Sequence, residues 1–162
     1  MKHQSKARIL VVWAGRHRRS VWTELCERYG RRIRRHVGIE EIAVKVAARA
    51  ADQARCEIEG RAILEKVPTG SCLVALDSRG RQRTSEELAR WLGRVLEGSR
   101  RPLVFALGSD LGLGENVTAA ADERISFGAV TLPHELARVV LFEQIYRTLC
   151  ILKGMKYHRE PL

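Results

Sequence analysis

Short, uninterrupted apolar runs alternate along the chain with longer stretches in which apolar residues recur every three or four positions. Runs of this length without polar alternation are typical of strands buried on both faces of a parallel sheet. The clearest are Ile9 to Trp13, Cys72 to Leu76 and Leu103 to Leu107, and weaker ones are Ile39 to Val46 and Ile125 to Phe127. The alternation predicts one α/β domain over residues 1–162, with a mostly parallel sheet and helices on both of its faces.

Capping residues mark where the helices between these strands begin. Ser20 stands before a stretch whose apolar residues share one side, and Asp52 stands before a second stretch that runs to about Lys66. The segment Thr84–Glu87 has the spacing of a capping box, in which each side chain bonds to the other residue's backbone N–H. We expect a helix after each of these signals, the third of them ending near Gly98.

The last predicted helix is apolar on more than one face. Pro133 suits its first turn, and Gly154 suits its end. A helix that is apolar nearly all round must be buried on several sides. In so short a chain, this predicts a helix shared between the core and a partner subunit. Its apolar residues are Leu136, Val139, Val140, Leu141, Phe142, Ile145, Leu149, Ile151 and Leu152.

The chain is strongly basic, with 29 Lys and Arg against 19 Asp and Glu and a net charge of +10. Such an excess favours a polyanionic partner such as nucleic acid and speeds encounter with it, although charge also serves solubility alone. Arginine is heavily used, and its planar guanidinium suits phosphate. The densely basic segment 31–36 is either a solvated helix end or an RNA contact, and the sequence does not choose between the two.

The four cysteines do not form a metal-binding motif. Cys26, Cys56, Cys72 and Cys150 are widely separated and make no C-x-x-C pair, so we expect no metal. The run Ile9 to Trp13 is too short for the apolar part of a secretory signal, and no stretch approaches the length of a membrane span. These features predict a reduced, cytoplasmic protein that is not attached to a membrane.

Four motifs in the last third of the chain carry a resemblance to a known family. They are Thr131-Leu132-Pro133-His134, Arg138-Val139-Val140, Glu143-Gln144-Ile145-Tyr146-Arg147 and Tyr157-His158-Arg159. With looser agreement upstream, they resemble the SPOUT superfamily of RNA methyltransferases, specifically the small single-domain bacterial enzymes that methylate nitrogen 3 of a pseudouridine in 23S ribosomal RNA. The resemblance implies a SPOUT-type trefoil knot at the C-terminal end, which the periodicity does not show and general topology rules would not predict.

The resemblance also implies an S-adenosylmethionine site built from three loops. The implied contacts are Leu76, Gly108, Phe127, Gly128, Ala129, Val130, Thr131 and Leu132. Loops that follow parallel strands meet beyond the carboxyl ends of the strands, where ligands bind. Taken singly, each glycine loop is only a turn, and it is their coincidence that favours a site. Ser109 departs from the family pattern of paired glycines; because serine tolerates positive φ poorly, we expect a relaxed loop or weaker cofactor affinity.

Methyl transfer to an imide nitrogen requires alignment, exclusion of water and removal of a weakly acidic proton. Arg159 and His158 are candidates for stabilising the resulting anion, and His134 for positioning the base or accepting the proton. Tyr157 is a candidate for stacking on, or hydrogen bonding to, an extruded base. The alternatives without a functional role are that His134 only begins a helix and that residues 157–159 are a frayed tail. The resemblance implies a homodimer in which the tail of one chain reaches the cofactor of the other.

Three functions therefore stand as hypotheses. The first is S-adenosylmethionine-dependent methylation of 23S ribosomal RNA on assembled or nearly assembled ribosomes. The second is a cofactor-less, basic RNA-binding or ribosome-assembly protein on the same fold, which Ser109 would favour. The third is methylation of another RNA, such as transfer RNA, and the lack of an added RNA-binding domain in 162 residues disfavours it.

Overall fold

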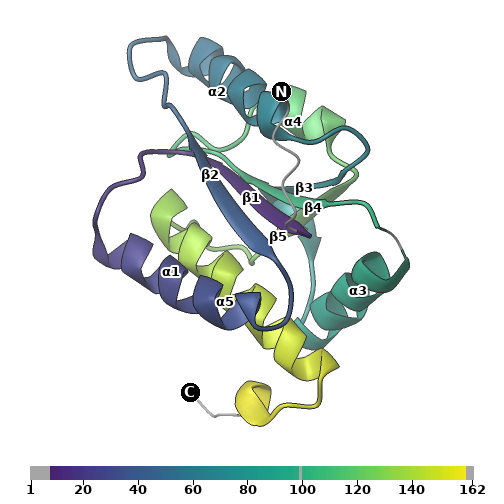
Figure 1. The fold of residues 1–162 in the computed structure, drawn as a ribbon. Helices are drawn as coiled ribbons and strands as arrows, with labels where there is room; N and C mark the ends of the chain where they lie inside the picture. The colour runs from purple at the N-terminus through teal and green to yellow at the C-terminus, as the bar shows by residue number, and fades with distance from the viewer. Residues whose placement is uncertain (1–7, 99, 160–162) are drawn as a thin grey trace.

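A single five-stranded sheet, with all strands parallel, runs through the centre of the protein (Figure 1). The computed structural model describes residues 8–98 and 100–159, with the backbone alone for His158 and Arg159. The spatial order of the strands is β2-β1-β4-β3-β5. Their bounds are β1 Ile9–Ala14, β2 Ile39–Val44, β3 Cys72–Gln82, β4 Leu103–Leu107 and β5 Glu123–Ser126. All five apolar runs in the sequence are therefore strands, and the predicted parallel sheet is confirmed.

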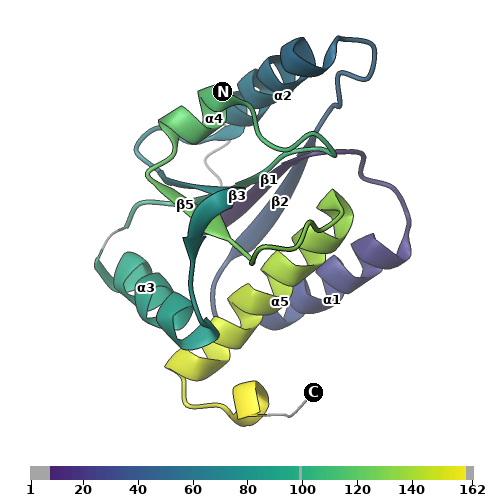
Figure 2. The same cartoon turned by 180° about the vertical axis from the view of Figure 1, so that it is seen from behind.

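Helices cover both faces of the sheet, as predicted. One face carries α1 (Val21–Arg34), α3 (Ser85–Gly98) and α5 (His134–Leu152), and the other carries α2 (Asp52–Lys66) and α4 (Glu115–Ala120), as Figures 1 and 2 show from opposite sides. Alternate residues of β1 point to the two layers. Ile9, Val11 and Trp13 join the core under α1, α3 and α5, whereas Leu10, Val12 and Ala14 join the core under α2.

The helix starts follow the capping signals closely. The Ser20 hydroxyl accepts a hydrogen bond from the Thr23 amide at 3.2 Å. Thr84 and Glu87 form the expected reciprocal box, at 2.8 and 3.1 Å. The start of α2 differs by one residue, because Ala51 occupies the cap position and Asp52 is already helical. The carboxylate of Asp52 lies in the first turn, where it still interacts favourably with the helix dipole.

The strand β3 is longer than its apolar run. The sequence predicts a strand that ends at Leu76 and a loop after it, but β3 continues to Gln82 along the edge strand β5. Leu76 and Arg81 are both opposite Ile125, so the four residues between them form a bulge. A bulge of this kind leaves its residues unpaired and redirects their side chains. It turns polar residues 77–79 toward the cleft at the carboxyl edge of the sheet.

The helix α5 is buried mainly by its own chain. It lies between α1 and α3 on one face of the sheet in both views (Figures 1 and 2). Its apolar residues that reach the core are Val139, Leu141, Phe142, Ile145, Leu149 and Cys150. Leu152, at its last position, is the most exposed large hydrophobic residue of the helix, at 43%. The all-round apolar pattern is therefore explained by three neighbours within the chain and does not by itself indicate a partner subunit.

A short 3₁₀ helix, η1 (Lys156–Arg159), follows α5 and folds back against it. The trefoil knot implied by the resemblance stays a prediction. The parallel sheet with β3 between β4 and β5, and α5 packed beneath these strands, is compatible with it.

Candidate functional site

Three chain segments converge at the carboxyl edge of the sheet and enclose a cleft of about 660 Å³. They follow β3, β4 and β5 and comprise residues 76–79, 107–113 and 125–134. The predicted cofactor residues Leu76, Gly108, Phe127, Gly128, Val130, Thr131 and Leu132 all line this cleft, and so does His134. Ala129 belongs to the same segment but does not line the cleft. The structure thus brings together, from three parts of the chain, nearly all residues that the resemblance assigned to the cofactor.

The backbone of two of these loops requires glycine. A Cβ atom placed on Gly108 would lie 2.1 Å from the carbonyl carbon of Gly112, across the tight turn of the middle loop. Gly128 has a φ of +122°, which side-chain-bearing residues rarely adopt. The Gly128 amide donates to the Ser126 hydroxyl at 3.2 Å and its carbonyl accepts from the same hydroxyl at 3.1 Å, so Ser126 fixes this turn, while both glycines let the loop backbone lie close to the cleft. Loop backbone in this position suits the recognition of a small polar cofactor.

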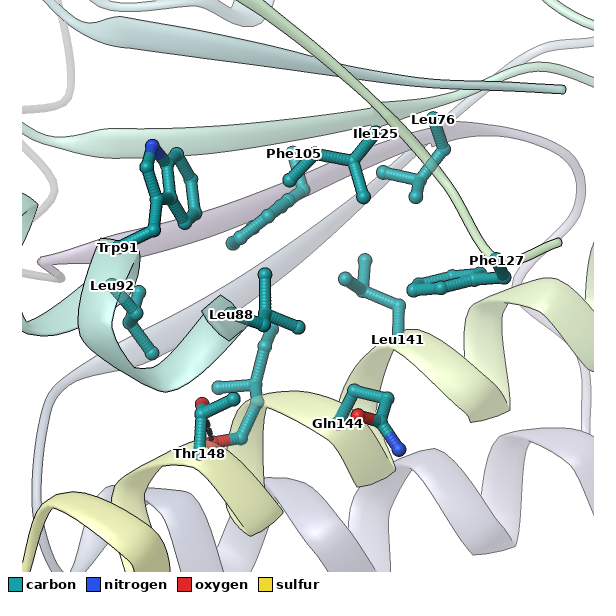
Figure 3. A pocket seen from close by; sticks show the side chains of 11 residues that line it. Leu76, Leu88, Trp91, Leu92, Phe105, Ile125, Phe127, Leu141, Gln144 and Thr148 are labelled. Carbon is teal, nitrogen blue, oxygen red and sulfur yellow. Dashed lines mark hydrogen bonds between the residues drawn. The ribbon is translucent and has the colours of Figure 1, made fainter. Parts of the chain in front are cut away.

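The floor of the cleft is apolar and continues into the core. Leu76, Ile125 and Phe127 line the cleft and also border a small void of about 10 Å³ between the sheet, α3 and α5 (Figure 3). Leu141 of α5 lies across this void from them (Figure 3). A space of this size is at the lower limit for one water molecule. The void is therefore a packing gap beneath the floor of the cleft and not a second ligand site.

Ser109 in the middle loop is held by side chains of α2. It is buried, and its hydroxyl donates to Glu59 Oε2 at 2.7 Å and accepts from Arg55 at 3.2 Å. Glu59, only 2% exposed, also accepts from Arg55 at 3.0 Å and from the amide of Ala47 at 3.1 Å. Arg55 reaches on to the carboxylate of Asp110, and this bond lowers the pKa of Asp110. We name Arg55, Glu59, Ser109 and Asp110 the loop clamp.

The loop clamp changes the interpretation of Ser109. Among the residues that the structure describes, positive φ occurs only at glycines, so Ser109 does not adopt the conformation that serine disfavours. The expected conformational conflict does not arise, and the hydroxyl instead gives the loop an anchor. Sequence reasoning missed Arg55 and Glu59. Their i, i+4 spacing was the only local signal, and it indicates no more than a helix-surface ion pair.

Asp77 places a carboxylate at the edge of the cleft. Its Oδ1 accepts a hydrogen bond from the Arg79 amide at 3.0 Å, whereas the buried Oδ2 receives none from any residue in the described ranges. The Arg79 guanidinium is the nearest cation, at 3.5 Å from Oδ2. A buried acceptor without a hydrogen bond lowers the stability of the fold unless a ligand or water donates one to it. It is therefore suited to a hydroxyl or amino group of a bound molecule.

His134 is the first residue of α5 and faces the cleft, whereas the predicted tail residues lie at the opposite end of the helix. A helix of 19 residues is roughly 27 Å long, so a single chain does not bring Tyr157 to the cleft. His158 and Arg159 belong to η1, and their side chains fall outside the part of the chain that the structure describes. The structure thus separates the predicted site residues into two groups.

Tyr157 is firmly packed where it lies. Its hydroxyl is 3.3 Å from Glu143 Oε1 and 3.4 Å from the hydroxyl of Tyr29. Its ring makes an edge contact with Tyr146, with centroids 4.9 Å apart, and the guanidinium of Arg147 lies 5.0 Å from its centroid. Burial raises the pKa of Tyr157 well above its usual range. The hydroxyl therefore stays protonated at physiological pH and holds η1 against α5.

Arg138 is a buried arginine whose partner the sequence did not reveal. Its side chain is fully buried, lies 4.0 Å from the centroid of the Trp13 ring and pairs with Glu41 at 3.3 Å. This partner is on β2 of the same chain, so the ion pair lies neither within α5 nor between subunits. Glu143, by contrast, pairs within α5, with Arg147 one turn away at 2.6 Å.

The described part of the chain contains no cluster of three His, Cys, Asp or Glu side chains placed to hold a metal ion. None of its helices is both long enough and apolar enough to cross a membrane.

Comparisons with known proteins converge on one family. A family model described as "Predicted SPOUT methyltransferase" matches residues 7–158. The chain is 43% identical over 160 residues to "Ribosomal RNA large subunit methyltransferase H" of Methylobacterium nodulans, covering 94% of this chain and 98% of that one. It is 45% identical over 157 residues to the protein of the same name from Rubrobacter xylanophilus, covering 93% and 98%.

A solved structure shares the fold. It is described as a probable methylase family protein from Haemophilus influenzae, and it superposes with a TM-score of 0.51 at 11% identity. The match covers 96% of this chain and 71% of that one. At this low identity the similarity extends to the arrangement of strands and helices only.

Proposed function

Because this chain belongs to the SPOUT methyltransferase family, we propose that it is an S-adenosylmethionine-dependent methyltransferase of 23S ribosomal RNA. The target we propose is nitrogen 3 of a pseudouridine, modified in the cytoplasm on an assembled or nearly assembled ribosome. The names of the relatives at 43% and 45% identity support an RNA of the large subunit. The observation that carries the proposal is the convergence of three loops on one cleft at the carboxyl edge of the sheet.

The cleft fits the cofactor in three respects. Leu76, Phe127 and Leu132 provide apolar surface for a flat purine, and the glycine loops offer backbone groups at close range. The carboxylate of Asp77 provides a buried acceptor without a hydrogen bond from the described chain. When bound, S-adenosylmethionine supplies an electrophilic methyl group. The role of these residues would be to hold it in a site with little water.

The acceptor nitrogen needs help in losing its proton, and two groups of residues are available. His134 lines the cleft and is suited to position the base or to accept the proton. Arg159 and His158 are suited to stabilise the anion that forms. Tyr157 lies at the same end of the chain as these two residues. Its proposed role is either to contact the base or to hold in place the tail residues that contact it.

The separation of these groups supports a homodimer. Because roughly 27 Å of helix lies between them, a composite site requires the tail of one chain to approach the cleft of its partner. Exposed apolar side chains occur at both ends, Leu111 and Val130 at the cleft and Leu152 and Met155 beside the tail. In a two-fold dimer that places the tail end of each chain against the cleft end of the other, both groups of exposed apolar side chains would be buried in both subunits.

Calorimetry with S-adenosylmethionine and mass spectrometry of ribosomal nucleosides test the proposal together. We expect saturable cofactor binding and loss of one methyl group from a pseudouridine in a strain that lacks the protein. Unchanged nucleosides together with the absence of binding heat would favour the cofactor-less assembly protein instead. Ser109, the residue that favoured this alternative, no longer does so, because the loop clamp accommodates it.

A substitution in the tail tests the composite site. Arg159→Ala should abolish methylation and leave cofactor affinity nearly intact, because residues between Leu76 and Ala137 line the cleft. Full turnover by this variant would exclude the role assigned to Arg159. Sedimentation provides the second measurement, since a stable monomer at micromolar concentration would rule out a site shared between subunits.

A further inference from the structure

The C-terminal half of α1 carries a row of arginines on one side of the helix. Arg28, Arg31, Arg32 and Arg35 recur at the spacing i, i+3, i+4 and i+7, which places them on one face. We name these four residues the arginine stripe. Three of them, Arg28, Arg31 and Arg35, are exposed. In the described part of the chain none of the four forms a salt bridge.

Aromatic rings join the arginine stripe to the C-terminal end of α5. The guanidinium of Arg32 lies 6.0 Å from the ring centroid of Tyr29 and 5.6 Å from that of Tyr146. Tyr146 in turn contacts Tyr157 of η1. The two helices lie side by side in both views, with their C-terminal ends at the same side of the molecule (Figures 1 and 2). The arginine stripe and the tail therefore share one surface, at the opposite end of α5 from the cofactor cleft.

Further positive charge gathers at this surface. Lys153 and Lys156, both exposed, follow the end of α5. His36 lies between the two helix ends, with its ring centroid 6.4 Å from that of Tyr146. Burial lowers the pKa of His36, and Lys153 and Arg35 lower it further. Cations from two different helices thus act on one imidazole.

The simplest alternative explanation is the stabilisation of α1 alone. Basic side chains in the last turn of a helix interact favourably with its dipole, but this effect fades beyond that turn. It accounts for Arg31, Arg32 and Arg35 and does not account for Arg28, which lies further back, and stabilisation of α1 does not explain Lys153 at the end of α5. A surface that gathers exposed cations from the ends of two helices is more suitable for an extended polyanion.

We propose that the arginine stripe, with Lys153 and Lys156, is a contact surface for the phosphate backbone of ribosomal RNA, outside the catalytic cleft. This inference rests on the proposed function and specifies where the RNA lies. Arginine suits this role because its planar fork pairs with phosphate oxygens in a bidentate manner. Contacts with phosphate fix the orientation of the RNA without reading its sequence. The surface would thereby hold the substrate next to the tail residues that act on the base.

A matched pair of triple variants tests this inference. The first, R28Q/R31Q/R35Q, removes the exposed charges of the stripe and keeps Arg32 in contact with Tyr29 and Tyr146. The control, R61Q/R90Q/R94Q, removes three exposed arginines of α2 and α3, which do not belong to the stripe and do not line the cleft. Each variant lowers the net charge from +10 by three, to +7. Binding to purified large ribosomal subunits that lack the modification is measured for both at several salt concentrations.

We expect the stripe variant to bind roughly tenfold to a hundredfold more weakly than the original protein, and the control to change far less. The slope of log affinity against log salt should become shallower by about 2 to 3, since each lost phosphate contact removes about 0.7 to 0.9. Equal losses in the two variants would overturn the inference, because they would show that only net charge matters.

A third variant, R28K/R31K/R35K, separates loss of charge from damage to α1. It keeps the charge and should recover most of the affinity; binding as weak as that of the glutamine variant would contradict a phosphate surface. Cofactor affinity should stay unchanged in all three variants. Failure of the proposed function is recognised separately, because the original protein would then neither bind S-adenosylmethionine nor methylate the subunits.

Discussion

The two ends of α5 differ in how they are built. At its N-terminal end, the cleft is formed by three loops that combine glycine backbone at 108 and 128 with apolar side chains, and no side chain caps the helix. At its C-terminal end, η1 is held through the Tyr157 hydroxyl, the carboxylate of Glu143 and an edge contact between the rings of Tyr157 and Tyr146. A site of loop backbone and apolar side chains suits a cofactor that is the same in every reaction. A site built from charged and aromatic side chains suits contact with RNA.

This difference also shows how each end is stabilised. The cleft end is stabilised by α2, because the hydrogen bonds of the loop clamp hold the middle loop against this helix. The tail end depends on contacts between α1 and α5, both of which belong to one helical layer. The two ends should therefore respond to different substitutions, cofactor affinity to one set and RNA methylation to the other.

The largest effect should come from Gly108→Ala. The added Cβ would overlap the Gly112 carbonyl carbon, at 2.1 Å, so the middle loop must move away from its position. We expect cofactor affinity measured by calorimetry to fall by roughly a hundredfold, the size expected when a site is displaced by about 1 Å. The control is Gly98→Ala, where nothing lies within 4 Å and affinity should not change. Equal affinity in both variants would show that the loop does not hold the cofactor.

The second effect should come from Glu59→Gln in the loop clamp. The substitution removes the charge that accepts from Arg55, Ser109 and the Ala47 amide, and it should lower the free energy of unfolding by about 1–3 kcal/mol. Because Ser109 loses its anchor, cofactor affinity should fall by roughly tenfold. Glu57→Gln, an exposed neighbour on α2, is the control. Loss of stability with unchanged cofactor affinity would reduce the loop clamp to a purely structural role.

The sequence predicted the framework well, because the framework depends on local patterns. Uninterrupted apolar runs marked all five strands, and capping residues marked the starts of α1, α2 and α3 to within one residue, whereas α4, which has no side-chain cap, was not predicted. It failed where structure depends on partners distant in the chain. The extension of β3 through polar residues 77–82 is stabilised by pairing with β5, about 45 residues later. The loop clamp joins residues about 50 positions apart, and Arg138 finds Glu41 across almost 100.

The residues of the candidate site also divide into those with a local signal in the sequence and those without one. Glycines after strands pointed to the cleft, because close approach and positive φ restrict the residue type locally. The contacts of Tyr157 with Tyr29 and Glu143 left no local signal, because they require α1 and α5 to be packed first. The assignment of Tyr157 as a residue that touches the base stays a prediction, and the next substitution tests it against a role in holding the tail.

Tyr157→Phe should have a smaller effect than either change at the cleft. It removes the hydroxyl bonds to Glu143 and Tyr29 and keeps the ring against Tyr146 and Arg147. A lost hydrogen bond of this kind costs about 0.5–1.5 kcal/mol. If the hydroxyl only positions the tail, methylation should fall a few-fold and cofactor affinity should not change. Complete loss of methylation with η1 still in place would instead show that the hydroxyl acts on the base.

The smallest effect concerns the protonation of His36 at the tail end. Its pKa lies below the ordinary value of 6.5, through burial first and then through Lys153 and Arg35. The unfolded chain therefore binds the proton more readily, so stability rises with pH up to about 6.5 and is lost as pH falls below it. Lys153→Gln should raise the pKa of His36 in an NMR titration.

The same titration sharpens the contrast between the two ends of α5. Phosphate oxygens of bound RNA at the arginine stripe should raise the pKa of His36, because they offset the cations of Arg35 and Lys153 that lower it. Because the proposed composite site brings the cleft of the partner chain to this end of α5, the RNA titration is carried out with S-adenosylmethionine already bound, so that any shift reports the RNA alone. An unchanged pKa of His36 on RNA binding would show that phosphate does not lie beside Arg35 and Lys153.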